Sequence, residues 1–143
     1  MESSPHLLKI EHIGIAVKDL SKAEEVYSAL LGVKPYKREA VEREGVITSF
    51  LRSGPNKIEL LESTREDGPI AKFIDKRGEG IHHIAFEVAD IRVEMKRLSE
   101  EGFQLLSEEP KPGADGKWVA FIHPKSSHGV LIELCQRMED SAE

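Results

Sequence analysis

The stretch GIHHIAFEVADI (residues 80–91) decides how the fold is interpreted, because it repeats IEHIGIAVKDL (residues 10–20) near the start of the chain. A shift of 71 positions places His12 on His83 and aligns an isoleucine, a valine and an aspartate around it. Internal self-similarity at a fixed spacing indicates a repeated structural unit. A repeat that keeps a histidine inside an apolar strand predicts that two copies of one unit build a single site.

Each copy predicts the same order of elements: strand, helix, strand, strand, strand. The first module, about residues 8–62, should contain a strand at 8–17, a helix capped by Asp19 or Ser21 and ended by Gly32, and strands at 33–41, 45–50 and 57–61. The second, about residues 80–136, should contain a strand at 81–89, a helix capped by Asp90 and ended by Gly102, and strands at 103–107, 117–122 and 130–135. The linker, about 63–79, predicts a short helix over 69–78, with Pro69 near its start and Gly78 past its end.

The expected fold class is therefore α+β. Two tandem βαβββ modules form one domain over residues 1–143, with a curved, mostly antiparallel eight-stranded sheet. Every sheet edge in such a fold needs covering, and a second copy of the chain can cover one, which favours a homodimer.

Bulk composition excludes several classes of protein. The net charge of −6 argues against nucleic acid as a partner, and a charged fraction of 32% without a long apolar run argues against a membrane span. The N-terminus lacks a basic segment followed by an apolar one, and a single cysteine, Cys135, leaves no intrachain disulfide. These features predict a soluble cytoplasmic protein.

Each module contributes one histidine from its first strand and one glutamate from its last. The pairs are His12 with Glu59, and His83 with Glu133. A glutamate within an Ile-Glu-Leu strand is unusual, since a buried carboxylate is normally paired or bound to a metal. Two imidazoles and two carboxylates without a thiolate suit a divalent ion such as cobalt, nickel, manganese, iron or zinc. We therefore expect these four residues to converge as metal ligands at the centre of the sheet.

His82 and His83 are neighbours on one predicted strand, so their side chains face opposite sides and only one of them shares the site. The repeat aligns His83 with His12, which makes His83 the predicted ligand and His82 a packing or surface residue. The other histidines are interpreted as solvated or uninformative: His6, His123 and His128.

Several segments together resemble one enzyme family. They are PIAKFI (69–74), GIHHIA (80–85), EPK (109–111), HPKS (123–126) and HGVLIEL (128–134). With the paired His/Glu plan they resemble the vicinal oxygen chelate superfamily and, within it, the methylmalonyl-CoA epimerases, over about residues 9–136. The His/Glu/His/Glu set alone fits glyoxalase I equally well.

The resemblance implies a metal-dependent epimerase of propionate metabolism that interconverts (R)- and (S)-methylmalonyl-CoA through an enolate. It implies a divalent ion, with Co²⁺ preferred over Ni²⁺, Mn²⁺ or Zn²⁺, a CoA thioester as the small-molecule partner, and Glu133 as both metal ligand and catalytic base. One departure concerns Thr48, which stands where bacterial members of the family carry a second glutamate. The second proton-transfer group is then Glu59, Glu44 or a metal-bound water, or Glu133 serves both faces of the intermediate.

Two other functions remain open at this level. Glyoxalase I (lactoylglutathione lyase) shares the ligand set and the enolate chemistry, and a non-catalytic small-molecule binding protein shares the fold. A ring-cleaving dioxygenase fits less well, because it needs two histidines and one carboxylate. Three lysines in the loops around the last strands are candidate contacts for the CoA phosphates or the free carboxylate: Lys111, Lys117 and Lys125.

Overall fold

A computed structural model of the chain describes residues 7–139 and contains both predicted modules. The first consists of β1 (Leu7–Ala16), α1 (Leu20–Leu31), β2 (Lys37–Val41), the 3₁₀ turn η1 (Glu42–Glu44), β3 (Val46–Ser53) and β4 (Asn56–Ser63). The linker helix is α2 (Pro69–Arg77). The second consists of β5 (Gly80–Val88), α3 (Ile91–Glu100), β6 (Lys111–Pro112), η2 (Ala114–Gly116), β7 (Lys117–Ile122), η3 (Pro124–Ser127) and β8 (Ile132–Arg137). The α+β class with two βαβββ modules is thereby confirmed.

The described chain forms two compact units, one of residues 12–82 and one of residues 83–139 together with 7–11. The strand order is β2-β3-β4-β1 in the first unit and β5-β8-β7-β6 in the second. In each module the first strand runs parallel to the last, whereas the neighbouring hairpin strands run antiparallel. Two strands far apart in sequence therefore lie side by side in each unit, and these are the strands predicted to carry His and Glu.

Both long helices begin in the same way, as the repeat predicts. The carboxylate of Asp19 accepts a hydrogen bond from the Lys22 N–H at 3.0 Å, so Asp19 rather than Ser21 caps α1. The carboxylate of Asp90 accepts one from the Val93 N–H at 3.2 Å and caps α3. Such a cap satisfies an N–H group that has no partner inside the helix.

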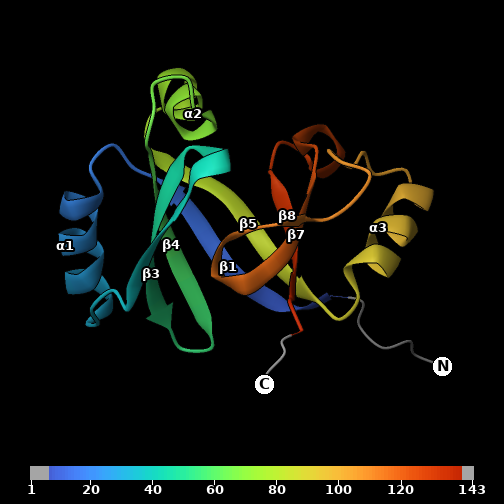
Figure 1. Cartoon of the computed structure of the whole chain (residues 1–143), viewed down its shortest axis with the longest axis horizontal. Helices are drawn as coiled ribbons and strands as arrows, with labels where there is room; N and C mark the ends of the chain where they lie inside the picture. The colour runs from blue at the N-terminus through green and yellow to red at the C-terminus, as the bar shows by residue number, and fades with distance from the viewer. Residues whose placement is uncertain (1–6, 140–143) are drawn as a thin grey trace. The chain divides into compact units, whose positions relative to one another are not determined.

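Apolar residues on one face of each sheet hold the helices. In the first unit α1 packs with Ile15, Leu51 and Leu60, and in the second α3 packs with Val88, Ile122 and Leu134. Figure 1 shows α1 beside β3 and β4, and α3 beside β7 and β8. Because strand side chains alternate, residues 59 and 133 lie on the face opposite these helices.

An ion pair ties α1 to its sheet. The Arg38 guanidinium on β2 donates to both oxygens of Glu24, from Nε at 2.9 Å and from Nη2 at 2.7 Å. The Ser49 hydroxyl on β3 donates to the same carboxylate at 2.5 Å. The Arg38 hydrogen bonds, supported by that of Ser49, outweigh the effect of burial and lower the pKa of Glu24.

The strand predicted at residues 103–107 is wrong. Leu105 forms a single bridge to Ile122, and β6 lies farther along the chain at Lys111–Pro112. Two backbone hydrogen bonds flank the bridge, from Leu106 N–H to the Phe121 carbonyl at 2.9 Å and from His123 N–H to the Gln104 carbonyl at 2.8 Å. The apolar alternation of this segment reflects packing on the α3 core rather than a continuous ladder.

Other boundaries shift by a few residues. The predicted strand at 33–41 is ordered as a strand from Lys37, the last strand runs over Ile132–Arg137 rather than 130–135, and α3 ends at Glu100, two residues before Gly102. His6 lies outside the described residues. Among the helices within residues 7–139, none has the length and apolar character required to cross a lipid bilayer.

Candidate functional site

In the first unit the structure brings His12 and Glu59 into contact. His12 Nδ1 lies 3.2 Å from Glu59 Oε2, and both side chains are buried. The parallel pairing of β1 with β4 sets this contact, since Gly14 is the register partner of Glu59 and His12 that of Lys57. Paired residues carry their side chains on the same face. The Glu59 carboxylate therefore reaches past a glycine to the histidine two residues earlier.

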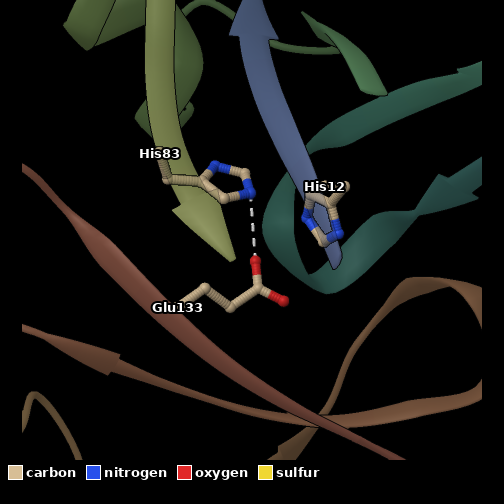
Figure 2. Close-up of side chains that lie close together, drawn as sticks. All are labelled: His12, His83 and Glu133. Atoms are coloured by element: carbon tan, nitrogen blue, oxygen red, sulfur yellow. Dashed lines mark ion pairs between the residues drawn. The ribbon is translucent and has the colours of Figure 1, made fainter. Parts of the chain in front are cut away.

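The second unit repeats this arrangement with His83 and Glu133. His83 Nε2 lies 3.0 Å from Glu133 Oε1, and again both side chains are buried. Figure 2 shows the imidazole projecting from β5 toward the carboxylate that β8 supplies. The register partner of Glu133 is Ala85, another small residue two positions after the histidine. The same register rule thus operates in both modules.

A phenylalanine flanks each glutamate on its other side. Phe50 pairs with Glu59 across β3 and β4, and Phe121 pairs with Glu133 across β7 and β8. The Phe121 ring meets the His83 ring edge to face, with centroids 6.0 Å apart and planes at 87°. Sequence reasoning missed these aromatic residues, although the 71-residue shift that aligns the histidines also aligns Phe50 with Phe121.

An ionised carboxylate among these neighbours is unfavourable in free energy unless it is paired. Each glutamate lies between a phenylalanine and a small residue, Gly14 or Ala85, and each is at most 6% exposed. A buried carboxylate needs hydrogen bonds or a cation to offset its lost hydration. Each module therefore supplies one buried nitrogen donor and one buried oxygen donor, a chemistry that fits a divalent ion of borderline hardness. The role of all four residues as metal ligands stays a prediction.

Thr48 lies on the same face of the first sheet as Glu59. It pairs with Leu61 on β4, two register positions from the Phe50–Glu59 pair, and is 2% exposed. Glu44, another candidate for the second proton-transfer group, is exposed on η1. The structure thus places a hydroxyl, rather than a carboxylate, beside the glutamate of the first module.

The other histidines within residues 7–139 make different contacts or are exposed. The His82 ring packs edge to face on Phe73 of α2 with centroids 4.9 Å apart, as expected for a packing residue. His123 precedes η3, where its Nδ1 accepts a hydrogen bond from the Lys125 N–H at 3.0 Å. His128 follows η3 and is exposed.

Of the three lysines proposed to contact phosphates or the free carboxylate, Lys117 does not fit. Its side chain is buried and its ammonium lies 3.3 Å from Asp115 Oδ2 and 3.6 Å from Glu11 Oε2. It therefore serves an internal ion pair. Lys111 and Lys125 are exposed, and their proposed role stays a prediction.

Comparison with known proteins gives concordant relationships. Residues 11–121 match the family model of the Glyoxalase/Bleomycin resistance protein/Dioxygenase superfamily. The chain is 43% identical over 130 residues to an ethylmalonyl-CoA/methylmalonyl-CoA epimerase of Cereibacter sphaeroides. This alignment covers 90% of this chain and 97% of the relative.

Two solved structures are also similar. A variant of the Streptomyces coelicolor methylmalonyl-CoA epimerase in complex with 2-nitronate-propionyl-CoA superposes with a TM-score of 0.88 at 39% identity, covering 93% of this chain and 99% of that one. The methylmalonyl-CoA epimerase of Mycobacterium tuberculosis superposes with a TM-score of 0.91 at 35% identity, covering 97% and 94% of the two chains.

Proposed function

Because the chain belongs to the methylmalonyl-CoA epimerase family of the glyoxalase/bleomycin resistance protein/dioxygenase superfamily, we propose that it interconverts (R)- and (S)-methylmalonyl-CoA. The observation that carries this proposal is the buried His–Glu contact that each module repeats in the same register, in a chain whose relatives are named as epimerases. The chemistry moves one proton at the carbon between the thioester and the free carboxylate.

The four residues that would hold a divalent ion are His12, Glu59, His83 and Glu133. The donor set fits, because it offers two imidazole nitrogens and two carboxylates, all buried, with no thiolate. When bound, the ion supplies positive charge that stabilises an enolate forming on substrate oxygens. We propose Co²⁺ as the native ion, and metal analysis of the purified protein distinguishes it from Ni²⁺, Mn²⁺ and Zn²⁺.

Glu133 is the group that we assign to proton transfer. Its Oε1 lies within hydrogen-bond distance of His83 Nε2, and Phe121 and Ala85 flank it. A positioned carboxylate within reach of a carbon-bound proton can act as a general base. Delivery of a proton to the opposite side of the planar intermediate completes the inversion.

The group that serves the opposite side is not Thr48, because a hydroxyl is far too weak an acid or base to act unaided. The proposal therefore assigns proton transfer to Glu133 and leaves Glu59, Glu44 and a bound water as candidates for the second face. Deuterium exchange separates these options. A single base carries some of the abstracted proton into the inverted product, whereas with two bases the inverted product takes its hydrogen from solvent deuterium.

The decisive experiment follows each pure epimer of methylmalonyl-CoA with metal-loaded protein in D₂O, by circular dichroism and by mass spectrometry. We expect inversion with incorporation of one deuterium. Glu133→Gln should lower kcat by about 10²- to 10⁴-fold, the range that a positioned base contributes. Glu100→Gln, at an exposed position on α3, is the matched control and should leave kcat unchanged.

Two outcomes contradict the proposal. Absence of inversion with all four metal ions, together with turnover of the hemithioacetal of methylglyoxal and glutathione, indicates glyoxalase I. Binding of acyl-CoA without exchange or turnover of either substrate indicates a non-catalytic binding protein.

Assembly as a homodimer completes the proposal. Strand β2 ends the order of the first unit and β6 that of the second, and an uncovered strand edge favours pairing with another chain. Light scattering of the purified protein measures the mass directly, and a monomer across the micromolar range contradicts this part.

A further inference from the structure

An arginine and a tyrosine form a stack on the surface of the first unit. The Arg52 guanidinium on β3 lies over the Tyr36 ring, with its central carbon 4.4 Å from the ring centroid, and both residues are exposed. Within residues 7–139 the Arg52 side chain forms no ion pair, whereas Arg38 on β2 binds Glu24. A guanidinium packed on an aromatic face has a fixed plane, and the N–H groups along its edge can still donate hydrogen bonds. The stack therefore presents an oriented cation at the surface.

Arg52 lies on the face of the sheet that carries the predicted metal ligands. It pairs with Lys57 across β3 and β4, and Lys57 pairs with His12 across β4 and β1. Because paired residues carry their side chains on the same face, Arg52 shares the face of His12 and Glu59.

The stack lies to one side of this face, next to β3. The Tyr36 N–H donates to the Phe50 carbonyl at 2.9 Å, and the centroids of the two rings are 5.9 Å apart. Phe50 in turn pairs with Glu59 on β4. Two strand spacings of about 4.8 Å each place the stack on the order of 10 Å from Glu59. A ligand group held there is remote from the glutamate but belongs to the same face.

The second module has no such stack at the equivalent place. The Leu106 N–H donates to the Phe121 carbonyl at 2.9 Å, just as Tyr36 does to Phe50, so Leu106 stands for the tyrosine. The 71-residue shift places His123 on Arg52, and the His123 Nδ1 accepts a hydrogen bond from a backbone N–H. A leucine and a histidine are thus compatible with the module, so the module plan does not require the stack.

The chemistry of an acyl-CoA fits an oriented cation at this distance. CoA carries a diphosphate and a ribose phosphate, and a long flexible pantetheine arm separates them from the thioester. The chain as a whole has a net charge of −6, so a phosphate needs a local cation to approach it. The planar fork of a guanidinium matches two phosphate oxygens at once.

We propose that Arg52, held by Tyr36, binds a phosphate group of the CoA tail. The inference rests on the proposed function, because it assumes that an acyl-CoA occupies the face that carries His12 and Glu59. Arg52 is the binding residue and Tyr36 a positioning residue. The contact is remote from the reacting carbon and is the same in substrate and intermediate, so its loss weakens binding and leaves turnover at saturation unchanged.

Three malonyl thioesters provide the test, since they share the acyl group and differ in phosphates: malonyl-CoA, malonyl-dephospho-CoA without the ribose phosphate, and malonyl-pantetheine without any phosphate. In titration calorimetry with metal-loaded protein, Arg52→Met should weaken malonyl-CoA binding about 10-fold, the low end for a hydrogen bond to a charged group because the site is exposed. Malonyl-pantetheine binding should change by less than about 3-fold. A loss that persists with malonyl-dephospho-CoA assigns Arg52 to the diphosphate, and one that disappears assigns it to the ribose phosphate.

Arg77→Met is the matched control, because Arg77 is another exposed arginine over an aromatic ring, 5.9 Å from the Phe73 centroid on α2. It should leave all three affinities unchanged. Tyr36→Leu, which copies the second module, should lose part of the affinity for malonyl-CoA, and Tyr36→Phe should retain it. Arg52→Gln replaces the methionine variant if that variant does not fold.

Three results overturn the inference. The first is unchanged malonyl-CoA affinity in Arg52→Met, and the second is an equal loss for malonyl-pantetheine, which has no phosphate. The third is an equal loss in Arg77→Met, since surface charge in general would then explain the effect. If Arg52 contributes to malonyl-CoA binding as expected but the protein inverts neither epimer, the proposed function fails while this inference stands.

Discussion

Replacement of Gly14 by leucine tests whether the register rule positions the metal ligands. Gly14 is buried and is the register partner of Glu59, whose Oε2 lies 3.2 Å from His12 Nδ1. Side chains of paired residues are only about 4.5–5.5 Å apart at Cβ. A leucine would occupy the path by which the carboxylate reaches the histidine, so Gly14→Leu should separate Glu59 from His12.

The expected size of the effect has two parts. A buried carboxylate that loses its partner costs about 3–5 kcal/mol, and the removal of a glycine from a strand returns about 0.5–1 kcal/mol. The free energy of unfolding of metal-free protein should therefore fall by about 2–4.5 kcal/mol. Cobalt affinity should fall at least about 100-fold, because the change displaces a ligand itself rather than its outer partner.

Urea unfolding of metal-free protein measures the first quantity and calorimetric titration with Co²⁺ the second. Gly14→Ala is the control: Ala85 occupies the equivalent position beside Glu133, so a methyl group should be accepted with affinity within about 10-fold. If Gly14→Leu folds with unchanged stability and binds Co²⁺ as tightly as the wild type, position 14 does not control the glutamate and the reasoning is refuted.

Three further changes test other parts of the structure. Thr48→Val should leave kcat within about 3-fold, because a buried hydroxyl supplies too little acid–base strength to matter, and a fall above 100-fold would place it in proton transfer. Glu24→Gln should lower the free energy of unfolding at pH 7 by about 1 kcal/mol. The expected loss is small because the Arg38 side chain is 43% exposed, so that water screens the ion pair. Because the folded-state pKa of Glu24 is lowered, this stability is present above the ordinary pKa of 4.5 and is lost as the pH falls through the folded-state pKa. The free energies of unfolding of the variant and the wild type should therefore converge in acid. A difference that stays constant with pH would exclude the ion pair as the cause of the lost stability. Leu134→Ala should cost about 2–5 kcal/mol in chemical unfolding, because Leu134 is fully buried in the α3 core, whereas a loss under 1 kcal/mol would mean that the core collapses around the gap.

The sequence predicted the two-module plan because the repeat and the aspartate caps are local signals. Asp19 and Asp90 precede their helices directly, and their carboxylates form the expected capping bonds. The partners of His12 and His83 were also predictable, since a glutamate in an apolar strand requires a partner. Both glutamates contact the histidine of their own module.

The register between distant strands and the irregular pairing near residues 103–107 could not be predicted from the sequence. Gly14 and Ala85 act through their position beside a glutamate on a parallel strand, and no local pattern specifies which residues of two distant strands pair. The failed strand at 103–107 has a similar cause. Phe103 and Leu105 alternate as strand residues do, but they pack on the α3 core, while the backbone near them makes only scattered bonds to β7.

The two His–Glu contacts differ in the ring nitrogen that faces the carboxylate. His12 faces its glutamate with Nδ1 and His83 with Nε2. A carboxylate accepts a hydrogen bond, so when the two rings are neutral the proton that faces the glutamate is on Nδ1 in His12 and on Nε2 in His83. Long-range ¹H–¹⁵N correlation spectra distinguish these forms directly. The imidazole signals of the two modules can therefore be told apart although their sequences are similar. A metal titration followed by these spectra shows which histidine signal changes first.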